Sequence, residues 1–209
     1  MACRAMTSPD RSKTTRLFLD GFERVVITGL FAWLCYRFYG TLGETPANMV
    51  FLISEGAVAL FVLLRRTTDQ ISVKPFDWAV GGVGTMLPML LSPSGAGWSG
   101  GAIFLIAGAV IALGAKLSLR RSFGIVAANR GVKRDGLYGA VRHPMYLGYF
   151  LANAGVLMLN FSIFNACLLI VWAACQLARI RAEEHVLFQD PAYQAHAEKV
   201  RFRLLPLVY

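Results

Sequence analysis

Long apolar runs separated by short polar segments dominate the chain. The runs cover residues 25–39, 47–64, 78–115 and 144–178. A helix that crosses a membrane needs about 20 residues at a rise of ~1.5 Å per residue. The first two runs therefore predict one helix each, and the last two are long enough for two helices each.

Internal turns divide the two longer runs. Residues 92–101 read SPSGAGWSGG, a series of turn-forming residues in the middle of the third run. Residues 160–162, Asn-Phe-Ser, divide the fourth run in the same way, and its first arm is short for a full crossing. The pattern predicts an all-α membrane protein with five to six transmembrane helices.

The division of the chain follows from the same pattern. We expect residues 1–24 to form a cytoplasmic tail, disordered over residues 1–13 because these are polar and basic. Residues 25–209 are expected to form a single integral membrane domain. The first apolar run lacks the small-residue cleavage pattern of a signal peptide and is expected to be a retained helix.

The distribution of basic residues then predicts on which side of the membrane each polar segment lies. The chain has 21 Lys and Arg residues against 12 Asp and Glu residues, a formal charge of +9. In an alternating topology every basic residue except Arg37 falls on one side. The positive-inside rule therefore predicts a multi-pass protein, in a bacterial inner membrane, with both termini and the two long polar segments in the cytoplasm.

Composition narrows the function classes. Apolar residues make up 56% of the chain and charged residues 16%, against roughly 25% charged in an average globular protein. These proportions exclude a disordered, collagen-like or coiled-coil chain. The basic residues flank apolar runs instead of lining one exposed face, so no nucleic-acid partner is expected. No CxxC or Cys/His cluster occurs among the four cysteines, and no metal site is expected.

Within the apolar runs, small residues and one acid stand out. Gly108 with Ala112, and Gly148 with Ala152, have the helical spacing that allows close packing in lipid. Glu55 is the one acid well inside an apolar run. It is expected either to line a tunnel or to pair with a neighbouring helix, because charged residues in lipid usually face protein or water.

Residues 120–149 form the first polar segment with candidate chemistry. Gly124, Gly131, Gly136 and Gly139, with an Asp-Gly turn at Gly136, predict a structured loop at the membrane face. The loop leads into Arg142, His143 and Pro144, where proline turns the chain into the next helix. Free amides at this helix start favour anions, although a basic membrane anchor explains the same residues.

The second polar segment follows the last apolar run, at residues 178–206. Glu183 and Glu184 stand among basic residues and can grip a cation or an amine, or form a solvated flank. Arg201 and Arg203 can contact anionic lipid or a ligand carboxylate. The segment contains no dinucleotide-binding glycine motif, P-loop or nucleophile elbow.

Taken together, these two segments resemble the isoprenylcysteine carboxyl methyltransferase family and its bacterial relatives, the phospholipid methyltransferase-like integral membrane proteins. The resemblance covers residues 101–206, about half the chain, which we regard as the methyltransferase-like core. One departure is His196, where relatives often carry a second tyrosine after Tyr193. The resemblance rests on RHPMYLG at residues 142–148, the preceding Gly136-Leu137-Tyr138, the apolar hairpin, Arg181 with Glu183-Glu184 and Leu187, and the closing Arg203-Leu204-Leu205-Pro206.

This resemblance implies an S-adenosylmethionine-dependent methyltransferase that acts on a lipophilic acceptor entering from the bilayer. The cofactor would lie in a cytoplasmic pocket made by the loop before RHPMYLG and the C-terminal segment. Arg142 is expected to position an anionic acceptor group, and Glu183 to orient the acceptor. The amides near His143 and Tyr146 are expected to help hold the cofactor. The full set expected to bind the cofactor is Tyr138, His143, Pro144, Tyr146, Gly148, Glu184, Arg201 and Arg203.

Two alternatives stay open at this stage. Sterol reductases with a similar motif use NADPH, and a membrane protein of the same fold can bind lipid without catalysis. Phospholipid amine, prenyl-cysteine carboxylate and a small lipophilic molecule all fit as acceptor. Under each alternative, the two polar segments are expected to pack together on one face of the membrane.

Overall fold

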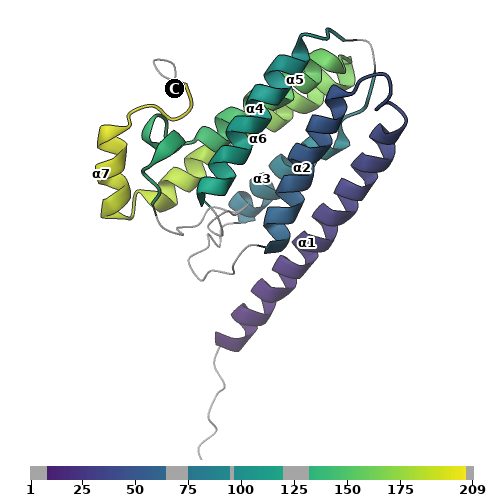
Figure 1. The fold of residues 1–209 in the computed structure, drawn as a ribbon. Helices are drawn as coiled ribbons and strands as arrows, with labels where there is room; N and C mark the ends of the chain where they lie inside the picture. Colours follow the sequence, from purple (N-terminus) through teal and green to yellow (C-terminus); the bar gives the residue numbers. More distant parts are fainter. Residues whose placement is uncertain (1–8, 65–74, 95–96, 120–131, 206–209) are drawn as a thin grey trace, which may run out of the picture.

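The chain folds into an all-helical bundle. A computed structural model describes residues 9–64, 75–94, 97–119 and 132–205, and no strand occurs in these ranges. Figure 1 shows the helices as one elongated bundle, with α1 along its edge and α7 set off at the end where α5 begins and α6 ends. The elements, in chain order, are α1 (Pro9–Tyr39), α2 (Ala47–Leu64), α3 (Pro75–Met86), the 3₁₀ turn η1 (Leu87–Leu90), α4 (Gly101–Leu119), the 3₁₀ turn η3 (Gly136–Gly139), α5 (Pro144–Leu159), α6 (Ile163–Leu187) and α7 (Pro191–Lys199).

The predicted hairpins are confirmed, and two predicted helix ends are wrong. Helix α3 ends at Met86 and α4 begins at Gly101, and α5 and α6 are separated by residues 160–162. Residues 9–13, expected to be disordered, begin α1, because Pro9 suits a first helical turn and no glycine follows before Gly21. Helix α6 continues well past the apolar run, so Glu183 and Glu184 lie on its last turns.

In the described part of the chain, three helices are long and apolar enough to cross a membrane. They are α2, α4 and α6, while the apolar helix α5 is shorter. Large apolar side chains on these helices are exposed, among them Ile53, Ile103 and Ile170. Such exposure suits contact with lipid. The chain is therefore an integral membrane protein, and the count of five to six crossings stays a prediction.

Helices α4 and α5 are packed backbone to backbone. A Cβ atom added at Gly108 would collide with the backbone nitrogen of Ala152, and one added at Gly148 would lie 2.5 Å from the backbone nitrogen of Ala112. The predicted role of these glycines and alanines in close packing is confirmed. Since Arg142 and His143 immediately precede α5, this contact fixes one side of the candidate site.

A network of amides ties the opposite ends of the helices together. The Asn160 Nδ2 atom donates to Asn48 Oδ1 at 3.0 Å, and Asn165 Nδ2 donates to the carbonyls of Ser92 and Asn160. Arg37 donates to the Leu90 carbonyl at 2.9 Å and to Ser92 Oγ at 2.7 Å. These bonds join α1, α2 and both hairpin turns, and so hold α5 and α6 in register.

The close α4–α5 contact predicts that adding a single methyl group at Gly108 lowers the stability of the protein. Gly108→Ala should destabilise the protein by about 1–3 kcal/mol, because the atoms that must move are backbone atoms. Gly114→Ala in the same helix is the matched control, since its added Cβ would meet only Leu137 Cδ1 at 3.5 Å. Thermal unfolding in detergent measures both variants. Equal midpoints would show that the two helices are not in close contact at Gly108.

Candidate active site

The two polar segments meet where α5 begins and α6 ends. Two backbone bonds join the start of α5 to the segment after α7. The Arg142 amide donates to the Phe202 carbonyl at 2.9 Å, and the His143 amide donates to the Arg203 carbonyl at 2.8 Å. The predicted packing of the two segments is therefore confirmed for their described residues; Gly124 and Gly131 lie outside these.

These backbone bonds correct one expectation. The amides at the start of α5 were expected to help hold a cofactor, yet those of Arg142 and His143 are used by the C-terminal segment. Pro144, the next residue, is the first of α5 and has no amide hydrogen to donate. The amides of Arg142 and His143 are thus not available to a cofactor, while the expectation for the Tyr146 amide stays a prediction.

Glu184 is the centre of the side-chain network. Its Oε1 atom lies 3.0 Å from Arg142 Nη2 and 3.3 Å from His143 Nε2, and its Oε2 atom accepts from Arg203 Nε at 2.6 Å. The hydroxyl of Tyr193 also donates to Oε1, at 3.4 Å. A buried carboxylate needs such compensation, because leaving water costs several kcal/mol per ion.

Glu183 makes a second, smaller set of contacts. Its Oε1 atom accepts from the Tyr146 hydroxyl at 2.6 Å, and its Oε2 atom lies 3.8 Å from His143 Nδ1. The His143 ring therefore stands between the two carboxylates, with one nitrogen toward each. The guanidinium of Arg179 lies 5.5 Å from the centroid of the Tyr146 ring, which is within cation–π distance.

Helix α7 contributes two neutral side chains near the site, Tyr193 and His196. Burial and the nearby charge of Glu184 raise the pKa of the Tyr193 phenol, which stays a donor at neutral pH. Burial, together with the cations Arg134 and Arg142, lowers the pKa of the His196 imidazole and favours its neutral form. Arg134 also donates to the Ala192 carbonyl at 2.9 Å, which ties the loop before α5 to α7.

Other residues expected to bind the cofactor lie in different settings. Tyr138 is buried in η3, where burial and the charge of Glu183 raise the pKa of its phenol. Gly148 lies against α4, a position that serves helix packing. Arg201 is exposed and makes no hydrogen bond or ion pair with the described residues, so its role stays a prediction.

Sequence reasoning missed two members of the network. Tyr193 was used only to place the resemblance, and Arg179 was counted as a flanking charge. Helical spacing offered a signal for Arg179, since it precedes Glu183 by four residues and both lie on one face of α6. No comparable signal marked Tyr193, which reaches Glu184 only because α7 folds back.

The network combines both signs of charge in a small space. Two carboxylates, two guanidinium groups and an imidazole can bind a ligand that itself carries positive and negative groups. The Nε atom of Arg142 is buried without a hydrogen-bond partner among the described residues. A donor in this position favours an additional acceptor, because an unmet buried donor costs about 1–3 kcal/mol.

Removing the central charge should loosen the C-terminal segment. Glu184→Gln leaves Arg142 and Arg203 without their shared countercharge, and breaking a buried pair costs about 3–5 kcal/mol. We expect faster hydrogen exchange at the amides of Arg142 and His143, which bond to that segment. Glu198→Gln, on an exposed position of α7, is the control. Unchanged exchange in Glu184→Gln would show that the segment is held by other contacts.

Comparison with known proteins gives one family match. No individual curated protein matches the chain. Residues 102–189 match the isoprenylcysteine carboxyl methyltransferase (ICMT) family, a range that contains α5, α6, Arg142, His143, Glu183 and Glu184. Residues 102–189 are therefore similar to the isoprenylcysteine carboxyl methyltransferase family, and this similarity supports a membrane methyltransferase.

Proposed function

We propose that the protein is an S-adenosylmethionine-dependent methyltransferase that acts on a lipophilic acceptor from the bilayer. The observation that carries the proposal is the Glu184 network, which joins the start of α5, the end of α6, α7 and the C-terminal segment. In this proposal the cofactor pocket faces the cytoplasm, and both termini lie on that side. Membrane lipid surrounds the helices and supplies the path for the acceptor.

The donor set of the site suits this cofactor. S-adenosylmethionine carries an ammonium, a carboxylate and a sulfonium, so a pocket for it must offer both carboxylates and cations. The site holds Glu183 and Glu184 beside Arg142 and Arg203. We assign cofactor binding to Glu184, Arg203, His143, Tyr146 and Tyr138.

The acceptor is assigned to Arg142. Its Nη2 atom bonds to Glu184, while its Nε atom is buried without a partner among the described residues. The guanidinium can therefore keep its structural bond and still donate to a carboxylate or phosphate of the acceptor. It stands at the start of α5, where a lipid headgroup and a ligand from water would meet.

The reaction needs orientation more than covalent help from the protein. When bound, the cofactor supplies an activated methyl group, which moves to the acceptor while the electron pair of the broken bond stays on sulfur. A carboxylate acceptor needs no base, whereas an ammonium must first lose a proton. Glu183, held by Tyr146 at 2.6 Å, is the group assigned to orient the acceptor or take that proton.

One ligand titration separates this function from its two alternatives. Purified protein in detergent should bind S-adenosylhomocysteine and not NADPH, measured by calorimetry. Binding of NADPH alone would favour the reductase reading, and binding of neither would favour a non-catalytic lipid-binding protein. Tritium transfer from labelled cofactor into a lipid extract then identifies the acceptor class.

The assignment of Arg142 predicts separate effects on transfer and on cofactor binding. Arg142→Lys keeps the charge and loses the planar fork, so methyl transfer should fall by about 10²-fold, as for loss of one transition-state donor. Binding of S-adenosylhomocysteine should change by less than about tenfold, or ~1.4 kcal/mol. Replacing Arg203 should instead weaken cofactor binding first.

Two results would overturn that assignment. If Arg142→Lys abolishes binding of S-adenosylhomocysteine, the residue belongs to the cofactor pocket. If the variant transfers methyl groups at the normal rate, the guanidinium acts only as a structural partner of Glu184. Arg181→Lys, at an exposed position of α6 outside the network, is the matched control.

A further inference from the structure

Arg179 is a buried cation that the proposed reaction does not use directly. It lies on the membrane helix α6, and only 5% of its surface is exposed. A buried guanidinium is costly unless other groups compensate its charge, so its partners must hold it in one place. It precedes Glu183 by one helical turn and shares a face of α6 with that residue.

Helix α3 and Gln176 hold the guanidinium of Arg179. Its Nη1 atom donates to Gln176 Oε1 at 3.1 Å and to Thr85 Oγ1 at 3.4 Å. Gln176 in turn donates through Nε2 to the Gly84 carbonyl at 3.1 Å. A Cβ atom added at Gly84 would lie 3.3 Å from Arg179 Cδ, which shows direct contact between α3 and this side chain. The position of Arg179 therefore depends on α3.

A small cavity borders this contact. It offers about 20 Å³ to a water-sized molecule, which is room for one water, and Thr85, Gln176 and Arg179 are among its lining residues. Glu55 lines the same cavity and lies within attraction of Lys116 on α4. Because the cavity is too small for a tunnel, the structure favours a pairing with the neighbouring helix, the second of the two roles expected for Glu55.

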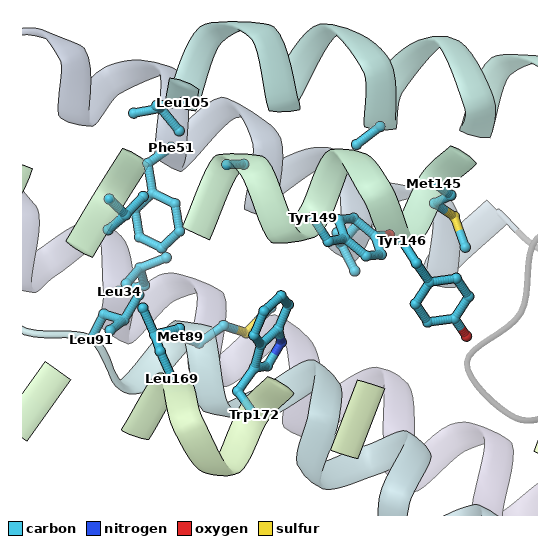
Figure 2. Close-up of a cluster of buried hydrophobic side chains, with 14 of the residues drawn as sticks. Leu34, Phe51, Met89, Leu91, Leu105, Met145, Tyr146, Tyr149, Leu169 and Trp172 are labelled. Atoms are coloured by element: carbon cyan, nitrogen blue, oxygen red, sulfur yellow. The ribbon is translucent and has the colours of Figure 1, made fainter. Parts of the chain in front are cut away.

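Arg179 also contacts the ring of Tyr146 on α5. Its guanidinium carbon lies 5.5 Å from the ring centroid, within cation–π distance. The ring is 1% exposed and stands edge-on to the ring of Tyr149, with 6.2 Å between centroids. Figure 2 shows Tyr146 and Tyr149 projecting from α5, with Trp172 rising from α6 toward them. Packing on several sides thus limits how the Tyr146 ring can turn.

The hydroxyl of Tyr146 binds Glu183, the residue assigned to the acceptor. It donates to Glu183 Oε1 at 2.6 Å. His143 Nδ1 lies 3.8 Å from the Oε2 atom, which is beyond hydrogen-bond distance. The Glu183 side chain is 19% exposed, against 5% for Glu184. The orientation of the Glu183 carboxylate therefore depends mainly on Tyr146.

We propose that Arg179 is a positioning residue for methyl transfer. It fixes the ring of Tyr146, and through the Tyr146 hydroxyl it fixes the carboxylate of Glu183. Arg179 itself touches neither the cofactor nor the acceptor. Helix α3, which lies outside the family match, thereby contributes to the reaction. The inference rests on the proposed function, since it assumes that Glu183 orients the acceptor or takes its proton.

Rates of methyl transfer measure this role. Arg179→Gln removes the cation from the Tyr146 ring, so kcat should fall by about tenfold to 10²-fold, as for a small displacement of a reacting group. The KM for the acceptor should change by less than about threefold, because Arg179 makes no contact with it. Arg179→Lys keeps a cation near the ring and should recover most of the lost rate. The assay is tritium transfer from labelled cofactor into a lipid extract in mixed micelles.

A double-mutant cycle tests whether Arg179 acts through the Tyr146 hydroxyl. Tyr146→Phe keeps the ring and removes the hydroxyl, so kcat should fall by a similar factor. In that background Arg179→Gln should lower kcat by less than about threefold more, because no hydroxyl is left to position. A purely structural role predicts that the two factors multiply. Arg181→Gln, exposed on the same helix, is the matched control and should leave kcat unchanged.

Infrared spectroscopy reports the Tyr146–Glu183 bond without turnover. In protein with ¹³C-labelled tyrosine, the phenol C–O band that disappears in Tyr146→Phe belongs to Tyr146. Its frequency depends on the hydrogen bond that the hydroxyl makes. The band should shift in Arg179→Gln, and it should stay at the wild-type frequency in Arg181→Gln.

Each remaining outcome decides the proposal. A normal kcat in Arg179→Gln, independent factors in the double-mutant cycle, or an unchanged infrared band would overturn it. Loss of S-adenosylhomocysteine binding in Arg179→Gln would assign the residue to the fold or the cofactor pocket, and would also overturn it. Failure of the proposed function is distinguishable, because wild-type protein would then bind no S-adenosylhomocysteine, while the infrared band would still show whether Arg179 holds the Tyr146–Glu183 bond.

Discussion

One buried carboxylate holds the functional end of this protein together. Glu184 lies in a place where an unpaired charge would cost several kcal/mol, so its partners must stay in position. Those partners, Arg142, His143, Tyr193 and Arg203, come from three separate parts of the chain. The electrostatic requirement of one side chain therefore fixes the loop before α5, helix α7 and the C-terminal segment around a common point.

The packing of the apolar helices holds this network in position. Glycine contacts bring α4 and α5 backbone to backbone, and the amides of Asn48, Asn160 and Asn165 fix the other ends of the helices. With both ends fixed, α5 and α6 can hold Arg142 and Glu184 at 3.0 Å from each other. In a membrane, packing and hydrogen bonding must determine which helices associate. Burial of apolar surface cannot do so, because a lipid chain covers an apolar side chain as well as another helix does.

Polar groups inside the bundle form a second level of organisation. Residues on one face of α6 pass from the neutral Trp172 and Gln176 to the charged Arg179 and Glu183. On this face of α6 the charged side chains thus lie at the end nearer the active site. A gradient of this kind suits a molecule whose reacting end is polar and whose remainder is largely apolar, and it accounts for ionisable side chains within helices that otherwise suit lipid.

The sequence by itself determined the helical membrane class, both hairpins and the glycine contacts, because run length, turn residues and helical spacing are local properties. It also marked Arg142, Glu183 and Glu184 as candidates. Only the tertiary structure decided which groups meet. Tyr193 and Arg203 reach Glu184 because α6 extends past its apolar run and α7 folds back. Such partners depend on the packing of distant segments, which apolar periodicity does not encode.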